Sequence, residues 1–221
     1  MKGKRKMIGL IIGMLIILLS FVVLYQPFIN YLISQASNPT GFVGNIITKI
    51  WSDYFRDLSD WTFKQVDLDE YNTILDVGFG GGANIKYIKE HRNECIVYGV
   101  DISEEAVKTA SELNQKHVDS GEVILTQGDV AYLQFEDNLF DLIVATQTHI
   151  YWSELEKGFL ECYRVLKQNG TLLITSEIDK IDYHLPKYKN PDDFVSFLYR
   201  IGYSEVNVKV SNNFVAFVCI K

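Results

Sequence analysis

The sequence predicts an α/β fold: a doubly wound, mostly parallel sheet with an antiparallel last strand, preceded by an N-terminal transmembrane or membrane-embedded helix. From Asn72 onward, short apolar runs alternate with helical patterns, which is the order of a parallel sheet built from βα units. The last two apolar runs are separated only by the turn residues 211–213, which return the chain antiparallel. Residues 7–25 carry no charge, and as a helix they would be about 28 Å long, close to the hydrocarbon thickness of a bilayer.

Residues 1–34 are predicted to form a basic head and this membrane helix. Their charged residues are four bases, Lys2, Lys4, Arg5 and Lys6. A secretory signal peptide is the alternative, with residues 34–36 as a small-x-small cleavage site. Its apolar core is usually about 7–15 residues long, whereas the uncharged run here has 19. The length favours a retained helix, so we expect membrane association through residues 7–25.

Residues 35–70 are predicted to form a linker and an amphipathic helical segment, and residues 71–221 the α/β domain. Apolar side chains recur at three- and four-residue steps through Ile47, Ile50, Trp51, Tyr54 and Leu58. We favour packing of this stripe on the domain core. The alternative is an interfacial helix or a lid, with Trp51 and Trp61 against the membrane or the substrate.

The charge balance argues against a nucleic-acid ligand. Beyond residue 34 the chain carries 17 bases and 28 acids, a net charge of −11, so no basic surface is available to displace counterions from a phosphate backbone. No metal site is expected, because Cys95, Cys162 and Cys219 show no metal-ligand spacing. Each cysteine lies among or near apolar residues, which predicts reduced, buried thiols.

The apolar runs define the predicted strands. They lie at residues 74–77, 95–100, 123–126, 140–145, 171–175, 205–210 and 214–220. The run at 140–145 is almost wholly apolar, which indicates a strand buried on both faces. In the run at 205–210, Val206, Val208 and Val210 alternate with other residues and therefore share one face.

Turn and capping residues define the predicted helices. After the first strand, the glycines of residues 78–82 form a tight turn into a helix over residues 83–90. Ser103, followed by two glutamates, caps a helix that runs to about residue 118.

Two more helices follow in the second half of the domain. Ser153 and Glu156 form a capping box for a helix that runs to Leu166, and Asn169-Gly170 ends it by left-handed turn chemistry. Residues 190–193, Asn-Pro-Asp-Asp, start the last helix, and Gly202 stops it.

The glycine turn predicts a nucleotide-type ligand, because glycine lets a ligand approach the backbone and the following helix directs free N–H groups at it. Residues 78–83 also fit G-x-G-x-x-A, a weak dinucleotide fingerprint. Asp76, two residues before the turn, would repel a pyrophosphate and suit a cationic headgroup. Asp101, at the end of the second strand, can accept two ribose hydroxyls, and Asp129, after the third, can accept from the amino group of adenine. These acids describe a ligand with an ammonium, a diol and an amino-purine but no phosphate.

The domain resembles the class I S-adenosylmethionine-dependent methyltransferases of the small-molecule type with a single catalytic domain. The matching segments are residues 75–82, 98–101, 128–130, 140–144 and 163–170. Two departures are Phe79, in place of a small residue or cysteine, and Gln168-Asn169, in place of Pro-Gly. The resemblance implies a seven-stranded Rossmann-like methyltransferase sheet and the cofactor S-adenosyl-L-methionine.

The resemblance also implies cofactor-binding residues within the glycine turn and at the strand ends. Asp76 and Gly78 would lie near the methionine part, and Gly80 would allow close passage of the cofactor, with Gly82 closing the same turn. Asp101 would bind the ribose. Asp129 and the Val130 amide would read the adenine.

The acceptor is expected at the carboxyl end of the fourth strand, over residues 146–152. His149 is the residue there whose ordinary pKa suits a general base, although a packed or exposed histidine is an equal alternative. Gln147, Tyr151 and Trp152 are the predicted substrate-pocket residues; Tyr151 and Trp152 equally suit packing under the following helix.

The sequence therefore predicts a membrane-anchored S-adenosylmethionine-dependent methyltransferase that acts on a small-molecule or lipid-like acceptor. The alternatives are a catalytically silent cofactor-binding or partner-docking module and an NAD-dependent oxidoreductase. The expected location is the cell membrane, with the domain in the cytoplasm where the cofactor is made. The basic head before the apolar helix predicts the opposite orientation, with the domain outside. A helix that lies in the membrane without crossing it would reconcile the two inferences.

Overall fold

The computed structural model describes residues 56–221 and the isolated positions 25, 27, 29, 40, 42, 44 and 46. The chain divides into two compact units, residues 1–38 and 39–221. The predicted membrane helix, except for Tyr25, lies outside the described residues. Within the described part of the chain, no helix combines the length and the apolar character needed to span a bilayer.

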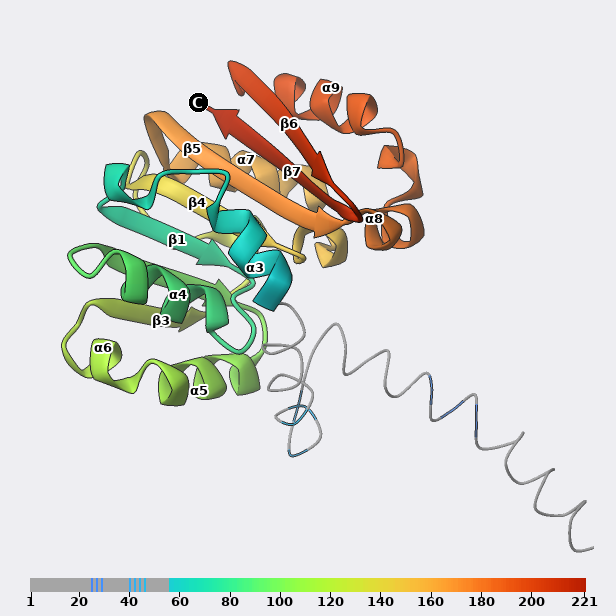
Figure 1. The fold of residues 1–221 in the computed structure, drawn as a ribbon. Coiled ribbons are helices and arrows are strands. Elements are labelled where there is room, and N and C mark those ends of the chain that lie inside the picture. The colour runs from blue at the N-terminus through green and yellow to red at the C-terminus, as the bar shows by residue number, and fades with distance from the viewer. Residues whose placement is uncertain are drawn as a thin grey trace, which may run out of the picture. The chain divides into compact units, whose positions relative to one another are not determined.

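A seven-stranded sheet forms the centre of the second unit, in the order β3-β2-β1-β4-β5-β7-β6 (Figure 1). Its strands are β1 Thr73–Val77, β2 Ile96–Asp101, β3 Val123–Gln127, β4 Phe140–Thr146, β5 Leu166–Glu177, β6 Glu205–Ser211 and β7 Phe214–Ile220. Strands β1 to β5 pair in parallel, whereas β7 is antiparallel to both β5 and β6. The predicted sheet and its antiparallel last strand are confirmed.

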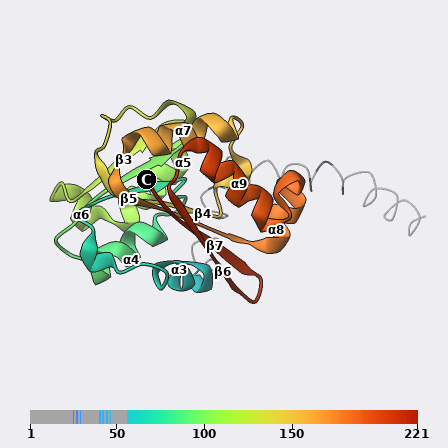
Figure 2. The same ribbon diagram turned by 90° about the horizontal axis from the view of Figure 1, so that it is seen from above.

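Helices cover both faces of the sheet. They are α3 Arg56–Phe63, α4 Ala83–His91, α5 Glu104–Leu113, α6 Gln115–Asp119, α7 Leu155–Val165, α8 Ile178–His184 and α9 Pro191–Ile201. Short 3₁₀ turns are η1 Leu68–Glu70, η2 Val130–Tyr132, η3 His149–Tyr151 and η4 Pro186–Tyr188. Helices α3 and α4 lie on one side of the sheet and α7 and α9 on the other (Figure 2).

Neighbouring residues of the central strands point into different cores, because side chains alternate along a strand. Ile74 packs with α4, whereas Leu75 packs with α7 and α9. In β5, Leu173 packs in the same core as Ile74, and Leu172 packs in the same core as Leu75. Burial on both faces explains why these strands read as continuous apolar runs.

Two predicted helices have different ends. The helix predicted to reach residue 118 breaks at Asn114, between α5 and α6. The side-chain amide nitrogen of Asn114 donates to the carbonyl oxygens of Gly82 (3.1 Å) and Ala110 (2.9 Å). The predicted capping box is wrong, because α7 begins at Leu155 and Glu154 is its N-cap, without a side-chain cap bond. Helix α8 was not predicted from the sequence.

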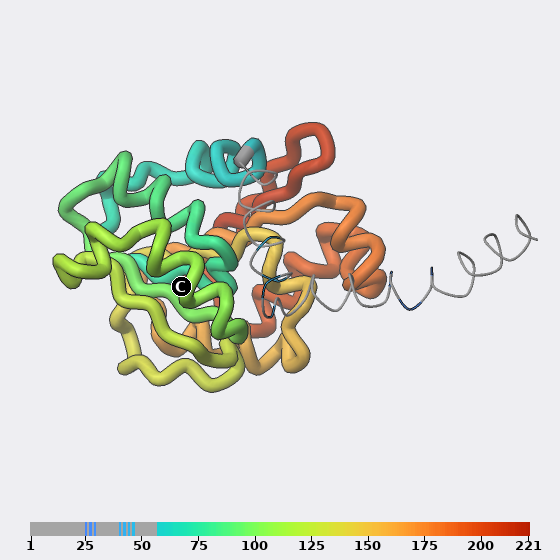
Figure 3. The backbone as a smooth tube through the Cα atoms, turned by 90° about the horizontal axis from the view of Figure 1, so that it is seen from below, coloured from blue at the N-terminus to red at the C-terminus, as the bar shows by residue number. Residues whose placement is uncertain are grey.

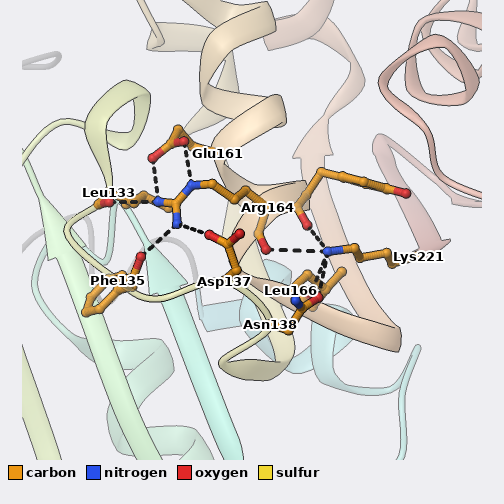
Figure 4. A network of polar contacts seen from close by, with 9 residues as sticks. Leu133, Phe135, Asp137, Asn138, Glu161, Arg164, Leu166 and Lys221 are labelled. Atoms are coloured by element: carbon orange, nitrogen blue, oxygen red, sulfur yellow. Dashed lines mark hydrogen bonds and ion pairs between the residues drawn. The ribbon is translucent and has the colours of Figure 1, made fainter.

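A lysine, instead of the predicted Asn-Gly turn, donates to carbonyl oxygens at the C-terminal end of α7 and at its C-cap. The Lys221 ammonium donates to the carbonyl oxygens of Tyr163 (2.6 Å) and Leu166 (2.7 Å) (Figure 4). Asn169 does take the predicted left-handed conformation, with φ of 60°, but within β5 and after the helix has ended. A cation therefore does the capping, as expected for the negative end of a helix dipole.

An arginine holds the segment after η2 against α7. Arg164 donates to the carbonyl oxygens of Leu133 (2.9 Å) and Phe135 (2.8 Å), and it pairs with Glu161 and Asp137 (Figure 4). These bonds hold the chain between η2 and β4 against helix α7.

The predicted starts of α5 and α9 and the predicted stop of α9 are confirmed. The Ser103 hydroxyl accepts from the Ala106 amide, and the Asn190 side chain accepts from the Asp192 amide. Gly202 ends α9 with φ of 127°.

Helix α3 belongs to the α/β unit. Leu58 is 1% exposed, and the Thr62 hydroxyl lies 2.7 Å from that of Thr175 in β5. The Trp61 ring lies 5.7 Å from that of Phe214, so α3 sits beside the start of β7 (Figure 3). The predicted packing of the apolar stripe on the core is thus observed at Leu58. The stripe positions at residues 47, 50, 51 and 54 lie outside the described residues.

Candidate active site

Three glycines of the turn between β1 and α4 have left-handed backbone angles. Their φ values are 71° at Gly78, 52° at Gly80 and 80° at Gly82. A Cβ on Gly78 would lie 1.9 Å from the Thr148 hydroxyl oxygen, so the turn closely approaches the loop after β4. A Cβ on Gly80 would meet nothing within 4 Å. The turn is therefore closely packed at its ends and open at its centre.

The Asp76 carboxylate is buried without a partner. It is 1% exposed, and neither oxygen has a hydrogen-bond partner within the described part of the chain. Burial, reinforced by the nearby charge of Asp101, raises the pKa of Asp76 to about 8. A buried carboxylate of this kind is costly unless a cation or a donor reaches it. It fits a ligand that brings an ammonium group to the turn.

Asp101 joins the end of β2 to the glycine turn. One carboxylate oxygen accepts from the Gly80 amide at 2.9 Å and the other from the Ser103 amide at 2.9 Å. Burial raises the pKa of Asp101, although both hydrogen bonds oppose that rise. The carboxylate thus holds the centre of the turn in its open conformation, a role that was not predicted.

Asp129 and Val130 lie at the start of η2, just beyond the end of β3. The Asp129 carboxylate accepts from the Ala131 amide at 2.9 Å, and Val130 is 7% exposed. The Gly128 amide donates to the Asp101 carbonyl at 2.9 Å. This bond places the ends of β2 and β3 together, as parallel pairing requires.

Gln147 clamps the ends of β4 and β5 together. Its side-chain oxygen accepts from the Glu177 amide at 2.8 Å and from the Ser176 hydroxyl at 2.9 Å. Its side-chain nitrogen donates to the Glu177 carboxylate at 3.2 Å. Of the other predicted pocket residues, Trp152 donates to the Thr148 hydroxyl and packs on Phe159, whereas Tyr151 is 37% exposed.

The comparisons with known proteins agree with this geometry. Residues 75–174 match the family model described as a methyltransferase domain. The chain is therefore similar to methyltransferase domains over these residues.

Two curated relatives illustrate the similarity. The uncharacterized methyltransferase YdaC of Bacillus subtilis is 24% identical over 158 residues, covering 71% of this chain and 85% of YdaC. The phosphoethanolamine N-methyltransferase of Plasmodium falciparum is 31% identical over 147 residues, covering 65% of this chain. The chain spans only 52% of that second relative's length.

A solved structure agrees in fold with the α/β unit of this chain. It is a putative S-adenosyl-L-methionine-dependent methyltransferase from Methanococcus maripaludis, with a TM-score of 0.63, 20% identity, and coverage of 80% of this chain and 93% of that one. The comparisons support S-adenosyl-L-methionine as the cofactor; they do not identify the acceptor.

His149 does not occupy the position expected of a general base. It is 1% exposed, its ring stacks 5.5 Å from that of Phe194, and neither nitrogen has a partner among the described residues. Burial lowers its pKa to about 3, which makes the ring a weak proton acceptor. The geometry therefore argues against the predicted base role.

We expect the His149→Phe variant to keep its turnover within about threefold and to be about 1 kcal/mol more stable, because an apolar ring replaces an unpaired polar one. The unfolded histidine takes up a proton below about pH 6.5, and the folded one only near pH 3. The stability of the wild-type chain should therefore decrease as the pH is lowered from about 6.5 to about 3, and the stability advantage of the variant should grow over the same range. Urea unfolding at pH 7 and pH 4.5 measures this, and a large loss of turnover at pH 7 would restore the base role.

Metal ligands do not gather in the domain. Among the residues that the structure describes, no group of three or more His, Cys, Asp or Glu side chains could hold a metal ion. All three cysteines are free and buried.

Proposed function

We propose that this protein is an S-adenosylmethionine-dependent methyltransferase that is anchored at the membrane and acts on a small-molecule or lipid-like acceptor. The buried, unpartnered carboxylate of Asp76 beside the open glycine turn carries the proposal. It suits the ammonium of an amino-acid headgroup and would repel the pyrophosphate of NAD. This electrostatic preference disfavours the oxidoreductase alternative.

Each strand end would hold one part of the cofactor. Asp76 would pair with the ammonium, and the turn over Gly78, Gly80 and Gly82 would let the methionine part pass close to the backbone. Asp101 would accept from the ribose hydroxyls. Asp129 and the Val130 amide would bind the adenine.

When bound, S-adenosylmethionine supplies a methyl group on a positively charged sulfur. The protein would contribute mainly proximity and orientation, which are worth several kcal/mol in a displacement between two bound groups. The loop after β4 approaches Gly78 through Thr148, so that loop would present the acceptor. A proton acceptor is needed only if the attacking atom must lose a proton first.

The uncharged residues 7–25 support the anchor. We place the domain in the cytoplasm, because a cofactor site would be idle outside, and a helix lying in the membrane would accommodate the basic head. Protease treatment of intact spheroplasts tests this placement. Release of the domain by external protease would contradict it.

Calorimetry and a transfer assay test the function. We expect S-adenosylhomocysteine to bind the full chain and NAD not to bind. Labelled methyl transfer into a cell extract, with and without added lipids, then separates the enzyme from a silent binding module. Binding without any transfer would favour the silent module, and binding of NAD alone would favour the oxidoreductase.

A further inference from the structure

Glu177 is an acid at the carboxyl end of β5, and no role was predicted for it from the sequence. In the β5–β7 ladder it lies opposite Phe214, the residue whose ring contacts Trp61 of α3. It is half-buried, and among the described residues no lysine, arginine or histidine forms an ion pair with it. The carboxylate therefore lies on the strand position opposite Phe214 and has no ion-pair partner among the described residues.

Gln147 determines where this carboxylate lies. Its φ of 57° is a left-handed conformation, which is unfavourable in free energy for any residue other than glycine. Such conformations are found more often at functional sites. The conformation lets the side-chain amide of Gln147 form hydrogen bonds to Glu177 through both of its polar atoms. The amide oxygen accepts from the Glu177 backbone N–H, and the amide nitrogen donates to the Glu177 carboxylate. The Gln147 amide also donates to the Thr175 carbonyl at 2.8 Å. The end of β5 is thereby tied to β4, the strand that pairs with β1 and Asp76.

The surroundings of Glu177 suit a cation. Burial, followed by the charge of Asp179, raises the pKa of Glu177, while Lys180 opposes the rise. Burial, followed by the charge of Glu177, raises the pKa of the Tyr151 phenol, and the Tyr151 ring meets the edge of His184 at 4.8 Å. Carboxylates and aromatic faces together recognise ammonium groups. The net charge of −11 beyond residue 34 would also attract a cationic acceptor.

We propose that Glu177, positioned by Gln147, binds the amino group of the acceptor, so that the substrate is a primary or secondary amine. This inference rests on the proposed methyltransferase function. An ammonium group, whose pKa is about 10, loses its proton far more readily than an alkyl hydroxyl does, so passing that proton to a carboxylate costs much less free energy for an amine acceptor than for a hydroxyl acceptor.

The proposed step balances in atoms and charge. The acceptor ammonium gives one proton to the Glu177 carboxylate and becomes a neutral amine. The nitrogen lone pair then forms the new C–N bond, while the bond between sulfur and the methyl carbon breaks and leaves its electron pair on sulfur. The product is a methylated ammonium, and the carboxylic acid returns its proton to solvent.

The test uses the full chain, diluted from detergent to below the micelle concentration, with labelled S-adenosylmethionine and three probes: phosphatidylethanolamine vesicles, phosphatidylglycerol vesicles and free ethanolamine. A cell extract divided by cation exchange at neutral pH serves as a wider source of amines. We expect label in at least one amine probe or in the retained fraction, and none in phosphatidylglycerol. Label in the vesicles would indicate a lipid headgroup, and label in ethanolamine or the retained fraction a soluble amine.

Variants separate the carboxylate from the fold. Glu177→Gln should lower amine methylation by about 100-fold, and Glu177→Asp by less, with S-adenosylhomocysteine affinity unchanged in both. Gln147→Gly tolerates the left-handed backbone and removes only the clamp, so it should raise KM for the amine more than it lowers kcat. The matched control is Glu112→Gln, an exposed glutamate on α5.

The outcomes separate the two proposals. Failure of the wild-type chain to bind S-adenosylhomocysteine would overturn the proposed function itself. Normal binding with no labelled amine at all, or with full amine methylation by Glu177→Gln, would overturn the role of Glu177 alone.

Discussion

Replacing Asp76 by asparagine is expected to stabilise the folded chain in alkaline solution while weakening S-adenosylhomocysteine binding by about 100-fold, because the buried charge that suits the ammonium is removed. The folded carboxyl has a pKa of about 8, against an ordinary value of 3.8. The stability associated with the protonated carboxyl is therefore complete below about pH 4 and is lost as pH rises towards 8. By urea unfolding, we expect Asp76→Asn to gain about 5 kcal/mol at pH 9 and almost nothing at pH 4.

The matched control for this prediction is Asp69→Asn, an exposed acid near the start of β1. It should change neither stability nor affinity. An equal gain at both pH values would refute the burial explanation, and an unchanged affinity would remove Asp76 from the cofactor site.

Proton release gives a second readout for Asp76. If an ammonium pairs with the carboxylate, binding to the wild-type chain at pH 7 must expel the proton that the buried group holds. Affinity should then rise with pH up to about 8, and calorimetry in buffers of different ionisation enthalpy should detect the proton. Asp76→Asn should show neither effect.

Replacing Gly80 by alanine is expected to weaken S-adenosylhomocysteine binding at least tenfold while the domain stays folded. Both Gly80 and Gly121 have positive φ values, 52° and 76°, and a Cβ on either would meet nothing within 4 Å. Each alanine should therefore cost about 1 kcal/mol of stability from backbone strain alone. Only the methyl group at Gly80 would fill the space at the centre of the turn.

Gly121→Ala is thus the matched control, because it carries the same backbone penalty at an exposed turn before β3. Thermal unfolding and calorimetry on both variants make the comparison. Equal affinity of the two variants would show that the cofactor does not pass Gly80.

Local pattern was enough to predict most elements of the fold. Short apolar runs and the Asn190 and Gly202 signals located strands and helices, because side-chain alternation and cap hydrogen bonds depend on residues close in sequence. The predictions failed where a distant residue intervenes. Lys221 caps α7 in place of Asn169, and the Asn114 amide, bonded to Gly82, lies where the long helix breaks.

The candidate site divides in the same way. The glycine turn and the acids at the strand ends are contiguous motifs, so the sequence by itself determined that a tight turn follows β1 and which acids lie at the carboxyl edge of the sheet. The left-handed angles at Gly78, Gly80 and Gly82 come from the structure. It could not reveal that Gln147 holds Glu177, since that contact depends on the register between two strands.

Only the tertiary structure decided the charge states. Asp76 and His149 are ordinary titratable residues in the sequence, but the elements packed around each leave both side chains almost wholly buried and without partners among the described residues. Burial raises the pKa of the first and lowers that of the second, because it penalises the charged form of each group. One becomes suited to a cationic ligand and the other becomes a poor base, since desolvation depends on how the whole domain packs.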